Sequence, residues 1–229
     1  MMLTDLMLAF GKSALFALAT ILPILNPAAT APIFLSLTRG ASASVRQRLA
    51  MHVARNVFLM LCTAMLVGSF VLAFFGISLP IVRIGGGLLV VATAWRLVNA
   101  SDTGSEAPAK IAENFTPDDA IRKAFYPLTF PLSCGPGSIA AAITVGASLR
   151  SPSLLVSGTQ VSGALLGLAA VGLVIFLCFR FAENLLKPLG ETGIVVFLRL
   201  SAFILLCLGV QIIWEGASEL MLDMMARAA

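Results

Sequence analysis

Charged residues are scarce in this chain of 229 residues. Only 11% of the residues are Asp, Glu, Lys or Arg, and there is one histidine. Soluble domains carry about 25% charged residues, so the composition excludes an ordinary soluble protein. The hydrophobic share of 59% and the mean hydropathy of +1.00 predict an integral membrane protein in contact with a lipid bilayer. The small net charge of +4 does not indicate a nucleic-acid partner.

The sequence also lacks the groupings that catalysis or cofactor binding would require. It has no CxxC pair, no His-rich cluster with metal-ligand spacing and no Gly-x4-Gly-Lys phosphate loop. No nucleophile with a base and no paired carboxylate set is recognisable. We therefore expect no catalytic residue, no metal site and no cofactor, and no enzymatic activity. The four cysteines raise a redox carrier as an alternative, but the first apolar segment has no cysteine to pair with Cys134.

Long apolar runs, by contrast, are abundant. About 20 consecutive apolar residues are needed to cross a hydrocarbon core about 30 Å thick. Six segments reach this length, so the predicted fold class is an all-α integral membrane protein with six transmembrane helices. The six segments are residues 13–37, 53–75, 79–98, 124–149, 154–181 and 193–214.

Lysine and arginine are distributed unevenly between the two ends of these segments. Ten of the 15 lie beside the connections that follow the first, third and fifth segments, and three lie on the opposite side. Cytoplasmic flanks retain an excess of cations during membrane insertion. We therefore expect both termini to lie outside the cytoplasm.

Residues 100–123 form a polar linker, in which Pro, Gly, Ser and mixed charges replace the apolar pattern. The linker is predicted to be cytoplasmic, and it separates residues 1–99 from residues 124–229. Each half then contains three segments. Because three is an odd number, the second half inserts upside down relative to the first.

Two of the six segments are broken by proline at matching places. The breaks are Asn26-Pro27 in the first segment and Gly135-Pro136-Gly137 in the fourth. Proline removes a backbone donor, so such a break persists in a membrane only where protein or a water-filled cavity satisfies the freed carbonyls. Arg83 and Arg199 also align without a gap. These coincidences predict two inverted three-helix repeats, with helices 1 and 4 broken and a solute site at the breaks.

At these residues the chain resembles the MarC family of bacterial inner-membrane proteins, which includes SnatA-type small neutral amino-acid transporters. The resemblance covers nearly the whole chain. It implies a six-span fold of two inverted three-helix repeats in the bacterial inner membrane, distantly like the LysE exporters, and transport of alanine, glycine and similar amino acids. The motifs that carry it are Leu25-Asn26-Pro27, Ala31-Pro32-Ile33-Phe34-Leu35-Ser36-Leu37-Thr38, Arg83-Ile84-Gly85-Gly86, Pro131-Leu132 and Gly135-Pro136-Gly137-Ser138-Ile139.

The residues around the breaks suit such a substrate. The ends of broken helices supply amide donors for a carboxylate and carbonyl acceptors for an ammonium group. Glycines there allow close backbone approach, which favours a small ligand. In the alternative interpretation, the prolines only kink helices and the glycines only pack one helix against another. The predicted substrate-binding residues are Asn26, Pro27, Thr30, Ser133, Gly135, Pro136, Gly137 and Ser138.

Arg83 and Arg199 lie inside apolar segments, where an unpaired guanidinium is costly. One hypothesis makes them the two gates of an alternating-access path, and the other has each side chain reach the lipid headgroups. Glu183, Glu191 and Glu215 are candidate ion partners. No acidic residue lies well inside a predicted segment, so a proton, a sodium ion and uncoupled transport all remain open as coupling modes.

The sequence therefore predicts a secondary transporter, either an exporter or an exchanger of small neutral amino acids. It would work by alternating access at a midplane site between the first and fourth segments. The alternative is a non-transporting inner-membrane accessory or assembly protein. Small residues at helix-packing spacing in the fifth segment leave a homo-oligomer open.

Overall fold

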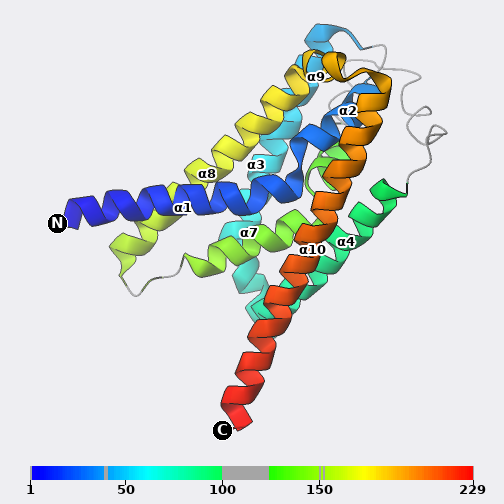
Figure 1. Ribbon diagram of the computed structural model, residues 1–229. Coiled ribbons are helices and arrows are strands. Elements are labelled where there is room, and N and C mark those ends of the chain that lie inside the picture. Colours follow the sequence, from blue (N-terminus) through cyan, green and yellow to red (C-terminus); the bar gives the residue numbers. More distant parts are fainter. Residues whose placement is uncertain (1, 39–40, 100–123, 150, 152, 229) are drawn as a thin grey trace.

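The computed structural model describes residues 2–38, 41–99, 124–149, 151 and 153–228, and these residues form an all-helical protein (Figure 1). The predicted all-α class is therefore confirmed. The linker 100–123 lies outside the described residues. In chain order the elements are α1 (Met2–Leu25), α2 (Pro27–Leu37), α3 (Ala43–Phe74), α4 (Leu79–Val98), η1 (Ala124–Ser133), α7 (Pro136–Ser148), α8 (Leu154–Arg180), α9 (Ala182–Leu186), η2 (Lys187–Leu189) and α10 (Gly190–Ala228).

The first predicted segment is broken where the sequence indicates, between α1 and α2. Asn26 separates the two helices and has a φ of 44°, the one positive φ among the described non-glycine residues. A residue before proline is disfavoured in the right-handed helical region, and asparagine tolerates the left-handed region better than most side chains do. Pro27 then begins α2 at a position where its missing N–H costs nothing.

The fourth predicted segment is broken more thoroughly. Its first part, η1, contains extended backbone at Tyr126 and Phe130, and each of these residues precedes a proline in the sequence. Gly135 is also extended, with φ −88° and ψ 176°, and α7 begins at Pro136. The conformational preference of residues that precede proline therefore accounts for the irregular backbone of the fourth predicted segment.

The described residues include five helices that are long and apolar enough to cross a membrane, where the sequence predicted six segments. The difference lies in the fourth segment, because α7 has only 13 residues. Three boundaries were also misplaced. Helix α1 begins at Met2 instead of residue 13, α3 at Ala43 instead of residue 53, and α10 extends to Ala228 instead of ending at residue 214.

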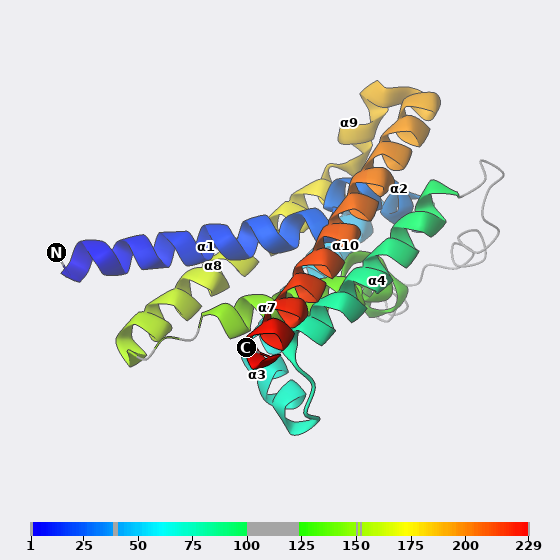
Figure 2. The same cartoon turned by 60° about the horizontal axis from the view of Figure 1, so that its bottom comes forward.

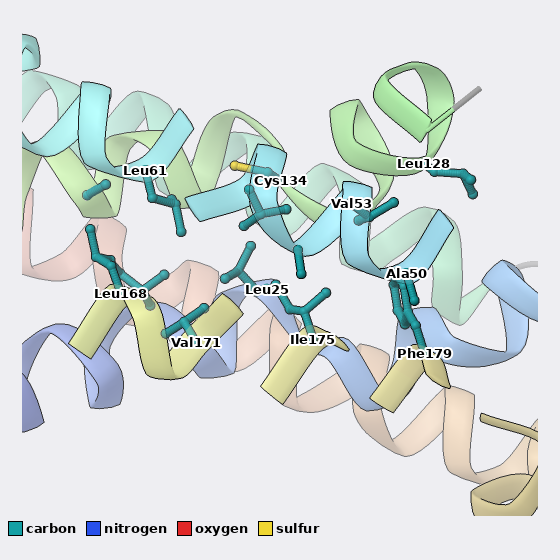
Figure 3. Packing of buried hydrophobic residues seen from close by; sticks show 14 of the residues in the cluster. Leu25, Ala50, Val53, Leu61, Leu128, Cys134, Leu168, Val171, Ile175 and Phe179 are labelled. Atoms are coloured by element: carbon teal, nitrogen blue, oxygen red, sulfur yellow. The ribbon is translucent and has the colours of Figure 1, made fainter. Parts of the chain in front are cut away.

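The main hydrophobic core is built from α1, α2, α3, η1, α7, α8 and α9. Figure 3 shows part of it, with Leu168, Val171 and Ile175 of α8 directed toward Leu61 and Val53 of α3. No described residue of α4 or α10 belongs to this core.

Glycines bring the helices of this core close together. A Cβ added to Gly163 or Gly167 of α8 would overlap the backbone of α1, and one added to Gly146 of α7 would overlap the backbone of α3. At one end of the core, the ring of Phe34 in α2 stacks on Phe179 of α8 with centroids 4.4 Å apart.

Helices α4 and α10 form a separate pair, and they make the most extensive helix–helix contact of the described chain. They lie side by side in both views (Figures 1 and 2). Val90 and Ala94 of α4 pack with Leu205 of α10 in a small second core. The protein thus consists of two packed bodies, a larger body of seven elements and the α4–α10 pair.

Candidate functional site

A cavity of about 420 Å³ lies where the two helix breaks meet the α4–α10 pair. It brings together seven of the eight predicted binding residues, since only Pro27, which is buried, is missing from its lining. The lining residues are Ile24, Leu25, Asn26, Ala29, Thr30 and Ile33 around the first break, Leu132, Ser133, Gly135, Pro136, Gly137 and Ser138 around the second, Leu89, Val90, Thr93, Arg96 and Leu97 of α4, and Leu205 of α10.

Asn26 organises the first break through its side chain. Its Oδ1 accepts a hydrogen bond from the Ala29 amide at 3.3 Å and so caps α2, while its Nδ2 donates to the Ser201 carbonyl of α10 at 3.5 Å. The Thr30 hydroxyl donates to the Pro27 carbonyl at 3.1 Å. Because Pro27 has no N–H, the Pro23 carbonyl at the end of α1 lacks its helical donor. The first break therefore has a capped helix start, and the preceding helix end lacks one helical hydrogen bond.

The second break differs because the start of α7 has no side-chain cap. The residue before the helix is Gly135, which has no side chain, and the amides of Gly137 and Ser138 lie in the first turn, where no helical acceptor exists. The Ser138 hydroxyl donates to the Gly135 carbonyl at 2.8 Å, and the Ser133 hydroxyl donates to the Leu128 carbonyl at 2.7 Å. The hydroxyls thus support the local turns. Gly137 and Ser138, at the N-terminus of α7 with its partial positive charge, are both among the residues that line the cavity.

The second break packs directly on α4. A Cβ added to Gly137 would overlap the Cγ2 atom of Val90, and one added to Gly86 would lie 2.5 Å from the Cβ of Ala140. Both glycines are buried. Gly137 therefore serves close helix packing and also forms part of the cavity wall, whereas Gly86 serves packing alone.

Arg96 is the one charged side chain that lines this cavity among the described residues, and sequence reasoning missed it. It was counted as a flanking cation that sets membrane orientation. A signal was nevertheless present, because Arg96 follows Leu89 and Thr93 at helical spacing and so lies on the same face of α4. The cavity combines this cation with uncapped helix amides, and its described lining contains no acidic residue.

Arg83 and Arg199, the predicted gates, are not brought together and line no part of this cavity. Arg83 forms an ion pair with Glu219 of α10. The sequence did not offer Glu219 as a partner, and Glu183, which it did offer, pairs with Arg46. Arg199 is an exposed residue of α10.

A second hollow, of about 810 Å³, lies between the same two bodies toward the far end of α10. Arg83, Glu215 and Glu219 line it, and Gln211 donates to Glu215 at 3.0 Å. Ile24 borders both this hollow and the cavity at the breaks. Glu215 and Glu219 lie in the long apolar helix α10, beyond residue 214, where the sixth predicted segment ends.

The described residues include no cluster of three or more His, Cys, Asp or Glu side chains that could hold a metal ion. Cys134 is buried beside the second break and lies 3.5 Å from the Ser138 hydroxyl, which donates to its sulfur. It is a free thiol, as are Cys62, Cys178 and Cys207.

Comparison with known proteins identifies relatives along almost the whole chain. The model of a family described as MarC family integral membrane proteins matches residues 12–221. The inner membrane protein MarC of Escherichia coli O1:K1 is 31% identical over 216 residues, which cover 93% of this chain and 98% of the relative. The protein of the same name in Salmonella typhimurium strain LT2 is 31% identical over 218 residues, covering 94% of this chain and 97% of the relative. No solved structure matches significantly.

Proposed function

The chain belongs to the MarC family of integral membrane proteins, and on this premise we propose that it is a secondary transporter of small neutral amino acids such as alanine and glycine. It would act as an exporter or exchanger in the bacterial inner membrane. The observation that carries the proposal is the cavity in which both helix breaks converge. Broken helices are tolerated at membrane depth where they line such a cavity, and transporters place their substrate sites there.

The polarity of the cavity suits a zwitterion. The substrate carboxylate would accept hydrogen bonds from the amides of Gly137 and Ser138 at the uncapped start of α7. The ammonium group would donate to backbone oxygens near Asn26. Leu25, Val90 and Leu205 would contact a short aliphatic side chain.

Inverted repeats are part of the proposal, and the pattern of helix contacts supports them. Under the predicted repeat, α1 and α2 correspond to η1 and α7, and α8 corresponds to α3. Helix α8 contacts both α1 and α2, as α3 contacts both η1 and α7. The first break reaches α10 at Ser201, and the second break packs on α4 near Gly86. Each break therefore contacts the third span of the opposite repeat, as a two-fold relation requires.

The two separate cores suggest which parts would move. Tightly packed cores move as units, because their packing is discrete and not continuously deformable. Both hollows lie between the larger body and the α4–α10 pair, so rocking of this pair would alternately open the cavity to the two sides. The ion pair between Arg83 and Glu219 joins α4 to α10, so a gate role for Arg83 would act through Glu219.

The orientation is proposed from the distribution of cations. Both termini would lie in the periplasm, and the connections that contain Arg46 and Lys187 would lie in the cytoplasm. The cavity then extends along α4 to Arg96, at its cytoplasmic end. The hollow that contains Glu215 and Glu219 would lie on the periplasmic side, where these acids are candidates for proton coupling.

The test is exchange of labelled alanine and glycine by the purified protein in liposomes, with imposed proton or sodium gradients of either sign. The double variant Asn26→Ala, Gly135→Leu is designed to disrupt both helix breaks and so to abolish exchange. Gly158→Leu is the control, because no atom lies within 4 Å of a Cβ added there. Exchange by the parent and the control, and its loss in a folded double variant, is the expected result. Absence of exchange under every gradient would refute transport and favour an accessory or assembly role.

A further inference from the structure

Arg96 occupies a position that the zwitterion proposal does not explain. A neutral amino acid carries one positive and one negative group, yet the described lining of the cavity contains a cation and no anion. The uncapped amides of α7 add partial positive charge. The electrostatics of the cavity are therefore complementary to a carboxylate, while an ammonium group would meet only neutral oxygen acceptors.

The geometry of α4 directs this charge toward the cavity. Leu89, Val90, Thr93, Arg96 and Leu97 all line the cavity, and each lies three or four residues from another member of this set, so they share one face of α4. Arg96 lies in the last turn of α4, at one end of the stretch of this helix that lines the cavity, while Val90, near the other end of that stretch, lies next to Gly137 at the second break. A carboxylate entering from this end would meet the guanidinium before it reached the helix amides.

We propose that Arg96 binds the carboxylate of the transported solute, and that this cavity recognises small monocarboxylates whether or not they carry an ammonium group. The inference rests on the proposed function in one respect, namely that the cavity is the solute site. Arginine suits this role because its planar fork of donors matches a carboxylate in a bidentate arrangement. The ligand class is a small aliphatic monocarboxylate, since the apolar part of the lining is mainly leucine, isoleucine and valine and the cavity holds about 420 Å³.

The test uses two analogues that each lack one charged group of alanine. Propionate keeps the carboxylate and loses the ammonium group, whereas ethylamine keeps the ammonium group and loses the carboxylate. Binding of each to the purified full-length protein is measured from the ligand-dependent rise in unfolding temperature, which increases with ligand concentration relative to Kd. Because binding is measured directly, diffusion of the small probes through the bilayer does not affect the result.

The variants are Arg96→Gln, Arg96→Lys and the matched control Arg180→Gln. Arg180 lies in the last turn of α8, is exposed as Arg96 is, and stacks over the rings of Phe176 and Phe181 instead of lining the cavity. Loss of a charge-assisted hydrogen bond weakens binding by about tenfold or more. We expect propionate to stabilise the parent and Arg180→Gln, to bind Arg96→Gln at least about tenfold more weakly, and to bind Arg96→Lys with intermediate affinity.

Three results would overturn the inference: stabilisation by ethylamine but not by propionate, no response to propionate at concentrations where alanine stabilises, or equal responses of Arg96→Gln and Arg180→Gln. Alanine exchange in liposomes is scored separately. If exchange is absent while propionate binds in an Arg96-dependent manner, the amino-acid function fails and the carboxylate site stands. If exchange proceeds without propionate binding, the amino-acid function stands and the inference fails.

Discussion

Gly87 of α4 and Gly209 of α10 face each other so closely that a Cβ added to Gly87 would lie 2.8 Å from the Gly209 carbonyl oxygen. A backbone atom cannot move aside as a flexible side chain can, so the two helices would have to separate. This contact lies on the same two helices as the second core and allows α4 and α10 to approach each other closely.

Gly87→Ala is therefore expected to destabilise the protein by about 1–3 kcal/mol. Gly85→Ala is the control, because nothing lies within 4 Å of a Cβ added at Gly85, and removing a glycine from a helix interior is neutral or favourable there. Thermal unfolding of the two variants in the same detergent checks the prediction. Equal unfolding temperatures would show that the α4–α10 contact does not hold the pair together.

Gly137→Ala tests the packing of the second break on α4. The added methyl group would overlap Val90 Cγ2, so α7 would be displaced from α4 and alanine exchange should fall sharply. Adding Val90→Ala to this variant removes the overlapping atom and should restore part of the exchange. Failure of this second substitution to restore any activity in a folded protein would argue against the steric explanation.

Substitutions at Asn26 can separate the effect of its left-handed backbone on stability from the effect of its side chain on transport. Asn26→Gly preserves the left-handed backbone but removes the cap on α2 and the hydrogen bond to Ser201, so fold and expression should persist while exchange is lost. Asn26→Ala adds a backbone penalty of about 1–2 kcal/mol, so it should unfold at a lower temperature than Asn26→Gly. Full exchange activity in Asn26→Gly would exclude the side chain from the transport path.

The ion pair of Arg83 and Glu219 should contribute little to stability. The two side chains are 21% and 49% exposed, and such pairs contribute about 0.2–1 kcal/mol. A double-mutant cycle of Arg83→Gln and Glu219→Gln should give a coupling energy in this range. The exchanged pair, Arg83→Glu with Glu219→Arg, should then transport better than either reversed single variant. Equal activity of all three would remove the ion pair from the transport cycle.

Much of the local structure could be predicted from prolines. Each break follows from proline and the residue before it, and Pro27 and Pro136 both begin a helix, as their position in the sequence indicates. The seven cavity-lining residues at the breaks were found in this way. The end of α10 was missed because Glu215 and Glu219 lower the hydropathy after Trp214, although the helix continues.

The remaining features depend on contacts between distant parts of the chain. Arg83 and Glu219 are 136 residues apart, and no local pattern connects them. The division into two cores likewise cannot be read from apolar periodicity, because buried and lipid-facing side chains are both hydrophobic in a membrane protein. The role of Arg96 was also missed, because the sequence pattern of a cation at a helix end is the same whether its side chain faces lipid headgroups or a cavity.

The most direct test of the account is whether a transported amino acid occupies the cavity between the two breaks. Thr30 lines this cavity and is half-buried, so we would place a single reactive thiol there by Thr30→Cys in a variant whose four native cysteines are replaced by alanine. The account predicts that alanine and glycine slow maleimide labelling of this thiol, with half-maximal protection near the concentration that half-saturates exchange. Exchange that proceeds while labelling remains unchanged would place the transport path elsewhere and contradict the account.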